Sequence, residues 1–136
     1  MLPALAHIDC WIFDLDNCLY PASATLSELT DRRMGDYIQR LCGVDVAEAR
    51  RMQKSYLHEH GTTLAGLMRT RGVDPHDFLD FVHDIDLARI AADPEVVAAI
   101  DRLPGRKFVF TNGDERYARR VLDRLGLPNA FDGMHD

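Results

Sequence analysis

The stretch Trp11-Ile12-Phe13-Asp14-Leu15-Asp16-Asn17-Cys18-Leu19-Tyr20 decides the fold class of this sequence. Its apolar part, within His7 to Leu15, is typical of a buried strand, and two carboxylates stand where that strand would end. Ligands of open α/β sheets bind outside the carboxyl ends of the strands. Residues two apart on a strand point to the same face. We therefore expect Asp14 and Asp16 to face a ligand together.

A second segment of the same kind lies far along the chain. The run Lys107-Phe108-Val109-Phe110-Thr111 predicts another buried strand, and Asn112-Gly113-Asp114 predicts a turn into a helix that ends at Gly126. Residues 130–134 are interpreted as the start of a third strand. Strands that alternate with helices predict an α/β fold with a parallel sheet.

Four helices are expected between Pro21 and about Ala92, which is more than one crossover between parallel strands needs. Typical helix starts and ends divide this region: Asp45 with Glu48, Thr62, Asp74-Pro75, Gly43, Gly61 and Gly72. We therefore predict a four-helix cap over residues 21–92. It would be inserted into an incomplete Rossmann-like core formed by residues 1–20 and 93–136.

Composition and charge exclude several classes of function. The 136 residues are 46% hydrophobic and 28% charged, as in ordinary globular proteins, and the net charge of -6 argues against nucleic-acid binding. No apolar run approaches the ~20 residues of a membrane span, and no secretory leader is expected before Asp9. Cys10, Cys18 and Cys42 lack metal-ligand spacing and are expected to be free thiols of a cytoplasmic protein.

The residues at the two predicted strand ends suit phosphoryl transfer. Repulsion between two neighbouring carboxylates is relieved by Mg²⁺, which prefers oxygen ligands. One carboxylate can then attack phosphorus, and the other can donate and later accept a proton. Thr111 and Asn112 offer hydroxyl and amide donors in front of a helix N-terminus, which favours anions. Because a solvated turn explains Asp14 and Asp16 as well, and a strand-end cap explains Thr111, only the combination carries the hypothesis.

Both segments resemble motifs of the haloacid-dehalogenase-like hydrolases. The residues Phe13-Asp14-Leu15-Asp16-Asn17-Cys18-Leu19-Tyr20 resemble the first motif of that family, and Phe108-Val109-Phe110-Thr111-Asn112-Gly113 resemble the second. The predicted helical cap between the two motifs resembles the members of that family whose cap follows the first motif. The pattern Asp-Leu-Asp-Asn-X-Leu-Tyr-Pro, with Gly61-Thr62-Thr63-Leu64 and Phe81-Val82-His83-Asp84-Ile85-Asp86, most resembles pyrimidine 5'-nucleotidases.

This resemblance implies a Mg²⁺-dependent phosphomonoester hydrolase that works through an aspartyl-phosphate. It implies that Asp14 is the nucleophile and a metal ligand, and that Asp16 is the general acid and base with its backbone carbonyl on the metal. Thr111 and Asn112 would hold the phosphoryl group of a small phosphorylated metabolite such as UMP or CMP. Two alternatives stay open: a phosphatase of the same family for sugar phosphates or phosphoglycolate, and a non-catalytic truncated remnant or binding protein.

The sequence departs from the family pattern in two places. Cys18 stands where the family usually has Thr, and a thiol is a weaker donor than a hydroxyl. The family also needs a later Lys or Arg and a later acidic pair, whereas Lys54 and Lys107 both precede the second motif. The ending at residues 131–136 resembles the middle of a family member. We therefore expect an incomplete sheet with Ile8 to Phe13 as an exposed apolar edge, open to self-association or to a partner strand.

Overall fold

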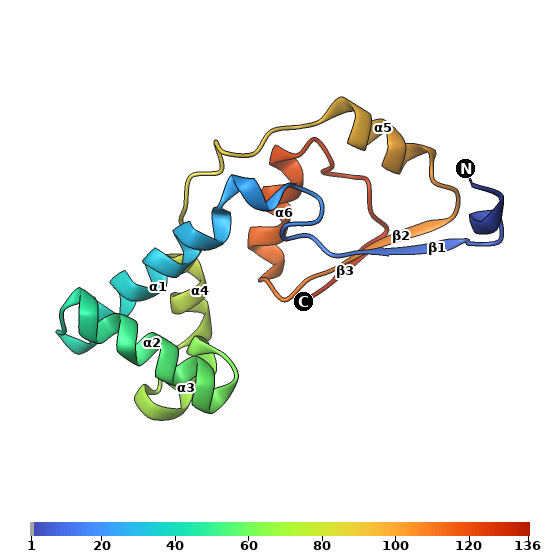
Figure 1. Cartoon of the computed structure of the whole chain (residues 1–136). Helices are drawn as coiled ribbons and strands as arrows, with labels where there is room; N and C mark the ends of the chain where they lie inside the picture. Colours follow the sequence, from blue (N-terminus) through green and yellow to red (C-terminus); the bar gives the residue numbers. More distant parts are fainter. Residues whose placement is uncertain (1) are drawn as a thin grey trace. The chain divides into compact units, whose positions relative to one another are not determined.

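The computed structural model describes residues 2–136, which divide into two compact units (Figure 1). The sheet unit comprises residues 2–25 and 87–136, and the helical unit comprises residues 26–86. The predicted division into a core and a cap was placed at 20/21 and 92/93. That division into functional parts stays a prediction, and each compact unit is described by itself.

The sheet unit contains three parallel strands in the order β1-β2-β3. They are β1 (Cys10–Phe13), β2 (Arg106–Phe110) and β3 (Gly133–His135). Helix α5 (Pro94–Arg102) precedes β2, and helix α6 (Glu115–Arg124) connects β2 to β3. Two short 3-10 turns, η1 (Pro3–Leu5) and η2 (Ala22–Ala24), complete the unit. The predicted α/β fold class is confirmed, and the small parallel sheet is consistent with an incomplete Rossmann-like fold.

The helical unit contains four helices, namely α1 (Leu26–Cys42), α2 (Val46–His60), α3 (Thr63–Arg71) and α4 (Pro75–Val82). Three helix starts fall where the sequence placed them. The side chains of Asp45, Thr62 and Asp74 accept hydrogen bonds from backbone N–H groups of the first turns of α2, α3 and α4. Within residues 2–136, none of the helices combines the length and the apolar character needed to cross a membrane.

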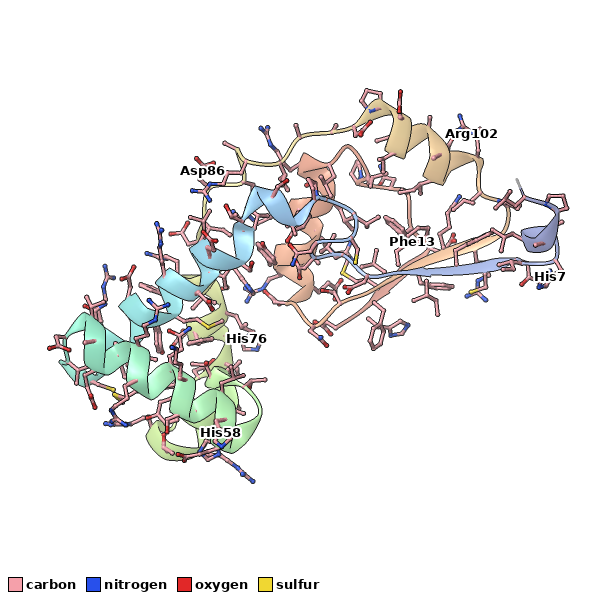
Figure 2. All side chains as sticks on the ribbon, in the orientation of Figure 1. His7, Phe13, His58, His76, Asp86 and Arg102 are labelled. Atoms are coloured by element: carbon pink, nitrogen blue, oxygen red, sulfur yellow. The ribbon has the colours of Figure 1, made fainter. Side chains whose placement is uncertain are left out.

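One face of the sheet is covered. Right-handed crossovers that advance in one direction along a sheet place their helices on the same face, and Figure 1 draws α5 and α6 on one side of the strands. Val109 is fully buried on that face, and the ring of Phe13, labelled in Figure 2, packs edge-on against Phe131 with 5.6 Å between ring centroids. The Lys107 ammonium donates to the carbonyls of Ile100 and Leu103, which caps the end of α5.

The opposite face of the sheet is bare. Ile12 pairs in register with Phe108, so these two residues and Phe110 share that face. Ile12 is 71% exposed and Phe110 is 58% exposed. Figure 2 shows side chains projecting from this face with no helix of the sheet unit over them. The prediction of two buried strands was therefore wrong for this face, because the run of apolar residues has no second layer of the sheet unit to pack against.

The exposed first strand is a predicted site for self-association. Strand β1 lies at an edge of the sheet, as expected, and Ile12 lies on its bare face. We predict that the chain associates with increasing concentration and that Ile12→Thr weakens this association severalfold, because an apolar edge strand invites pairing with another chain. Sedimentation velocity over a concentration series measures the effect. Leu57→Thr, at an exposed position of α2, is the control, and equal behaviour of both variants would contradict the prediction.

Candidate active site

The four predicted site residues follow the ends of two neighbouring strands. Asp14 and Asp16 come after β1, and Thr111 and Asn112 come after β2. Because β1 and β2 are parallel and Phe13 pairs with Val109, both segments leave the sheet at the carboxyl ends of its strands. Strand β1 ends at Phe13, so strand alternation does not orient the two acids as expected. Asp14 is exposed, whereas Asp16 is half-buried.

Asp16 and Thr111 meet at Gly113. A Cβ atom placed on Gly113 would lie 3.8 Å from Asp16 Oδ2 and 3.4 Å from Thr111 Oγ1. The carboxylate of one predicted motif and the hydroxyl of the other therefore both lie beside Gly113. The other oxygen of the same carboxylate, Oδ1, accepts a hydrogen bond of 2.6 Å from the Tyr20 hydroxyl.

A tight reversal of the chain brings Tyr20 back to Asp16. The backbone N–H groups of Cys18 and Leu19 both donate to the carbonyl of Leu15, at 3.3 and 3.0 Å. Asn17 takes a left-handed conformation with φ 60°, which asparagine tolerates better than most residues. Leu15 is fully buried and Tyr20 is 4% exposed, so packing holds both ends of the reversal.

Thr111 is built into the end of β2. It is buried, its N–H donates to the His135 carbonyl at 2.9 Å, and its Oγ1 accepts from the Gly113 N–H at 3.0 Å. Because a hydroxyl can accept and donate at once, the bond from Gly113 does not use the Thr111 O–H. Asn112 is exposed beside it. The local geometry thus suits Thr111 as a donor to a bound oxygen.

One donor at the N-terminus of α6 is already engaged. The backbone N–H of Glu115 donates to Asp136 Oδ2 at 3.2 Å, so a carboxylate of the chain already uses one donor of this helix end. The Asp14 side chain is also engaged locally, since its Oδ1 accepts from the Leu15 N–H at 2.7 Å. The Glu115 N–H therefore already has an anionic partner within the chain, and the expectation that this helix end favours a bound phosphate stays a prediction.

Two buried phenols lie behind Asp16. Burial, followed by the hydrogen bond to Asp16, raises the pKa of Tyr20 far above its usual value. Burial, followed by the charge of Asp16, raises the pKa of Tyr117 to about 12, although Arg120 and a side-chain hydrogen bond with Tyr20 oppose the shift. The sequence patterns gave Tyr20 only a place in the first motif and singled out no role for Tyr117. The spacing of four residues between Asp16 and Tyr20 is the only signal in the sequence that pointed to their contact.

The raised pKa values of these phenols predict a loss of stability in alkali. Below the ordinary tyrosine pKa of 10.0 both phenols are neutral in the folded and unfolded states, so their contribution is fully present. As pH rises above 10.0, the unfolded chain ionises before the folded one, and the free energy of unfolding falls. Urea unfolding at about pH 8 and about pH 11, followed by Trp11 fluorescence and tyrosinate absorbance, measures this. Ionisation of all four tyrosines near pH 10.0 in a folded chain would contradict the prediction.

The donors at this edge fit a water-rich magnesium site. Within residues 2–136, no three or more His, Cys, Asp or Glu side chains gather closely enough to hold a metal ion. Mg²⁺ is commonly bound through only one or two carboxylates, with water and substrate phosphates as its other ligands. Asp14, exposed and directly after the strand, satisfies the carboxylate requirement. The Asp16 carboxylate is partly engaged by Tyr20. The family resemblance implies the Asp16 backbone carbonyl as a second oxygen ligand, and this role stays a prediction.

No lysine of the sheet unit reaches the predicted site at the carboxyl ends of β1 and β2. Lys107 lies in the first half of β2, and its ammonium is bound to the end of α5. Arg116 and Arg119 are exposed on α6 and pair with Asp114 and Glu115.

Comparison with known proteins finds a relative named for phosphate metabolism. No protein-family model matches this chain. Phosphate metabolism protein 8 of Saccharomyces cerevisiae (strain ATCC 204508 / S288c) is 28% identical over 136 aligned residues. The alignment covers 91% of this chain and 42% of the yeast protein, so the chain spans less than half the length of that relative. The chain is thus similar, over nearly its whole length, to part of a protein named for phosphate metabolism.

Proposed function

We propose that the chain carries the phosphoryl-transfer half-site of a Mg²⁺-dependent phosphomonoester hydrolase of the haloacid-dehalogenase type. The approach of the Asp16 carboxylate and the Thr111 hydroxyl to Gly113, beside Asp14 at one sheet edge, carries this proposal. The similarity to a yeast protein named for phosphate metabolism supports it. The substrate class we propose is a small phosphomonoester, with pyrimidine mononucleotides such as UMP and CMP first, and sugar phosphates or phosphoglycolate as alternatives.

Each residue has a defined part in the proposed reaction. The Asp14 carboxylate attacks phosphorus, and an aspartyl-phosphate forms as the bond to the leaving oxygen breaks. Asp16 gives its proton to that leaving oxygen and then takes one from the water that attacks the aspartyl-phosphate. Thr111 and Asn112 donate to the phosphoryl oxygens. Mg²⁺, held by Asp14 and the Asp16 carbonyl, supplies positive charge against those oxygens when it is bound.

A second candidate function is phosphate binding without turnover. Two observations favour it: no cluster of three or more metal-ligating side chains is found within residues 2–136, and the Lys107 ammonium is bound to the end of α5. Charge neutralisation supplies much of the catalysis in phosphoryl transfer, so a site with fewer charges is expected to bind phosphate better than it turns it over.

The test is release of inorganic phosphate from UMP, CMP and p-nitrophenyl phosphate by the purified chain, with Mg²⁺ and with a chelator. We expect release that requires Mg²⁺. A folded chain that binds inorganic phosphate and releases none from any of the three compounds would support the second candidate. A folded chain that neither binds nor releases phosphate would rule out both.

A further inference from the structure

We propose that Tyr20 is the positioning residue for the general acid and base, because its hydroxyl fixes Asp16 Oδ1 and leaves Oδ2 as the oxygen that transfers the proton. This inference rests on the proposed function, in which Asp16 exchanges a proton with the substrate. It assigns a role to a residue outside the four predicted site residues. It also distinguishes the two oxygens of one carboxylate by their surroundings.

A short hydrogen bond joins Tyr20 to Asp16. The distance of 2.6 Å between the Tyr20 hydroxyl and Asp16 Oδ1 is that of a short hydrogen bond between two oxygens. Burial strengthens such a bond, because the local dielectric is lower than in water. Tyr20 is 4% exposed, so water competes little for its hydroxyl. The bond therefore holds one oxygen of Asp16 in a fixed place.

The other carboxylate oxygen of Asp16, Oδ2, lies on the side of Gly113. Asp16 Oδ2 is the oxygen that approaches Gly113, and the Thr111 hydroxyl approaches the same point. In the proposed reaction Oδ2 is therefore the oxygen of Asp16 on the side of the bound phosphoryl group. When Asp16 is protonated, its carbonyl oxygen Oδ1 accepts from Tyr20 and its O–H is at Oδ2. The proton of Oδ2 then passes to the leaving oxygen, which keeps the electron pair of the broken bond to phosphorus.

The chain reversal at Asn17 and the side chain of Tyr117 hold Tyr20 in place. The reversal at Asn17 turns the chain back on itself, so the Tyr20 hydroxyl reaches Asp16, which lies four residues earlier. A side-chain hydrogen bond connects Tyr20 with Tyr117, which is 5% exposed on the buried face of α6. Catalytic groups must be held within narrow limits of position and angle, and packing with such supporting bonds provides this. Helix α6 thereby contributes to the placement of Asp16 although it carries none of the predicted site residues.

The experiment compares two leaving groups in single-turnover reactions of the full chain with Mg²⁺. The nucleoside alcohol that leaves UMP needs a proton, whereas p-nitrophenolate leaves without one. We expect Tyr20→Phe to slow release from UMP by at least about tenfold and release from p-nitrophenyl phosphate by less than about threefold, with KM for both compounds unchanged. Tyr37→Phe, which removes the same oxygen in the helical unit, is the control and is expected to change neither rate.

Further variants keep the inference falsifiable if Tyr20→Phe does not fold, as judged by circular dichroism. Tyr117→Phe removes the phenol bonded to Tyr20 and is expected to give a smaller loss, again confined to UMP. In a double-mutant cycle, Tyr20→Phe added to Asp16→Asn is expected to cause no further loss of selectivity between the leaving groups. Equal losses on both compounds in folded variants would overturn the positioning role while the proposed function stands. No Mg²⁺-dependent release by the unaltered chain would overturn the proposed function, and the positioning role with it.

Discussion

Asp14→Asn is expected to abolish Mg²⁺-dependent phosphate release, with a fall in kcat of at least about 1000-fold. The amide has nearly the shape of the carboxylate, so the loop after β1 keeps its structure, and the amide oxygen can still accept from the Leu15 N–H. An amide is not a nucleophile towards phosphorus, and it brings no negative charge to Mg²⁺. The proposed reaction therefore loses its first step and part of its metal affinity in one substitution.

A matched control separates this effect from a general change of charge. Asp9→Asn makes the same substitution immediately before β1, at the opposite end of the strand, where the Asp9 side chain is exposed. We expect this variant to retain full phosphate release. Trapping of a phosphorylated chain from ³²P-labelled substrate, followed by peptide mapping, should place the label on Asp14. Activity of Asp14→Asn equal to that of the unaltered chain would remove Asp14 from the chemistry.

The parts of the fold that depend on local chemistry could be read from the sequence. Asp45 and Asp74 begin helices because a side-chain oxygen two or three residues before a free backbone N–H can accept from it, whatever the rest of the chain does. The alternation of strands and helices predicted the parallel sheet for a similar reason, since parallel strands need a long crossover.

Whether a side chain is buried depends on neighbouring elements, and the sequence of one strand does not describe them. The apolar run around Ile12 predicted a strand correctly and its burial incorrectly, because hydrophobicity states what a residue prefers and not whether a second layer is present. Lys107 illustrates the converse. Its position in a strand was predicted, but its bond to the end of α5 depends on how the helix lies over the sheet.

The candidate site was predictable in composition and not in arrangement. Asp16 and Thr111 were chosen because their chemistry suits phosphate, and the structure brings them together over Gly113. The role of Tyr20 was missed, because its contact with Asp16 exists only once Asn17 adopts a left-handed conformation. A positive φ at a non-glycine residue is rare, so a sequence pattern gave little reason to expect this reversal.

Gly105→Ala is expected to lower the free energy of unfolding by about 3–5 kcal/mol, the largest stability effect we predict for the sheet unit. Gly105 has φ 85°, and a Cβ atom there would lie only 2.1 Å from the carbonyl oxygen of Asp9. That carbonyl accepts a 2.8 Å hydrogen bond from the Arg106 N–H, next to the first pairing of β1 with β2. The added methyl group therefore cannot be accommodated without moving backbone, and the pairing of the two strands begins at the atoms that must move.

Gly126→Ala is the matched control, since it carries a similar left-handed penalty without the backbone collision. Gly126 has φ 74°, and the nearest atom to an added Cβ is the Ala92 side chain at 3.0 Å. We expect this variant to cost about 1–2 kcal/mol. Urea denaturation followed by the fluorescence of Trp11, the only tryptophan, reports on the sheet unit in both variants. Because the strand pairing at Arg106 also fixes the register of Phe13 with Val109, Gly105→Ala should weaken phosphate binding at the far edge of the sheet, whereas Gly126→Ala should not. Equal costs for the two variants would mean that the turn at Gly105 rearranges freely and does not set the strand register.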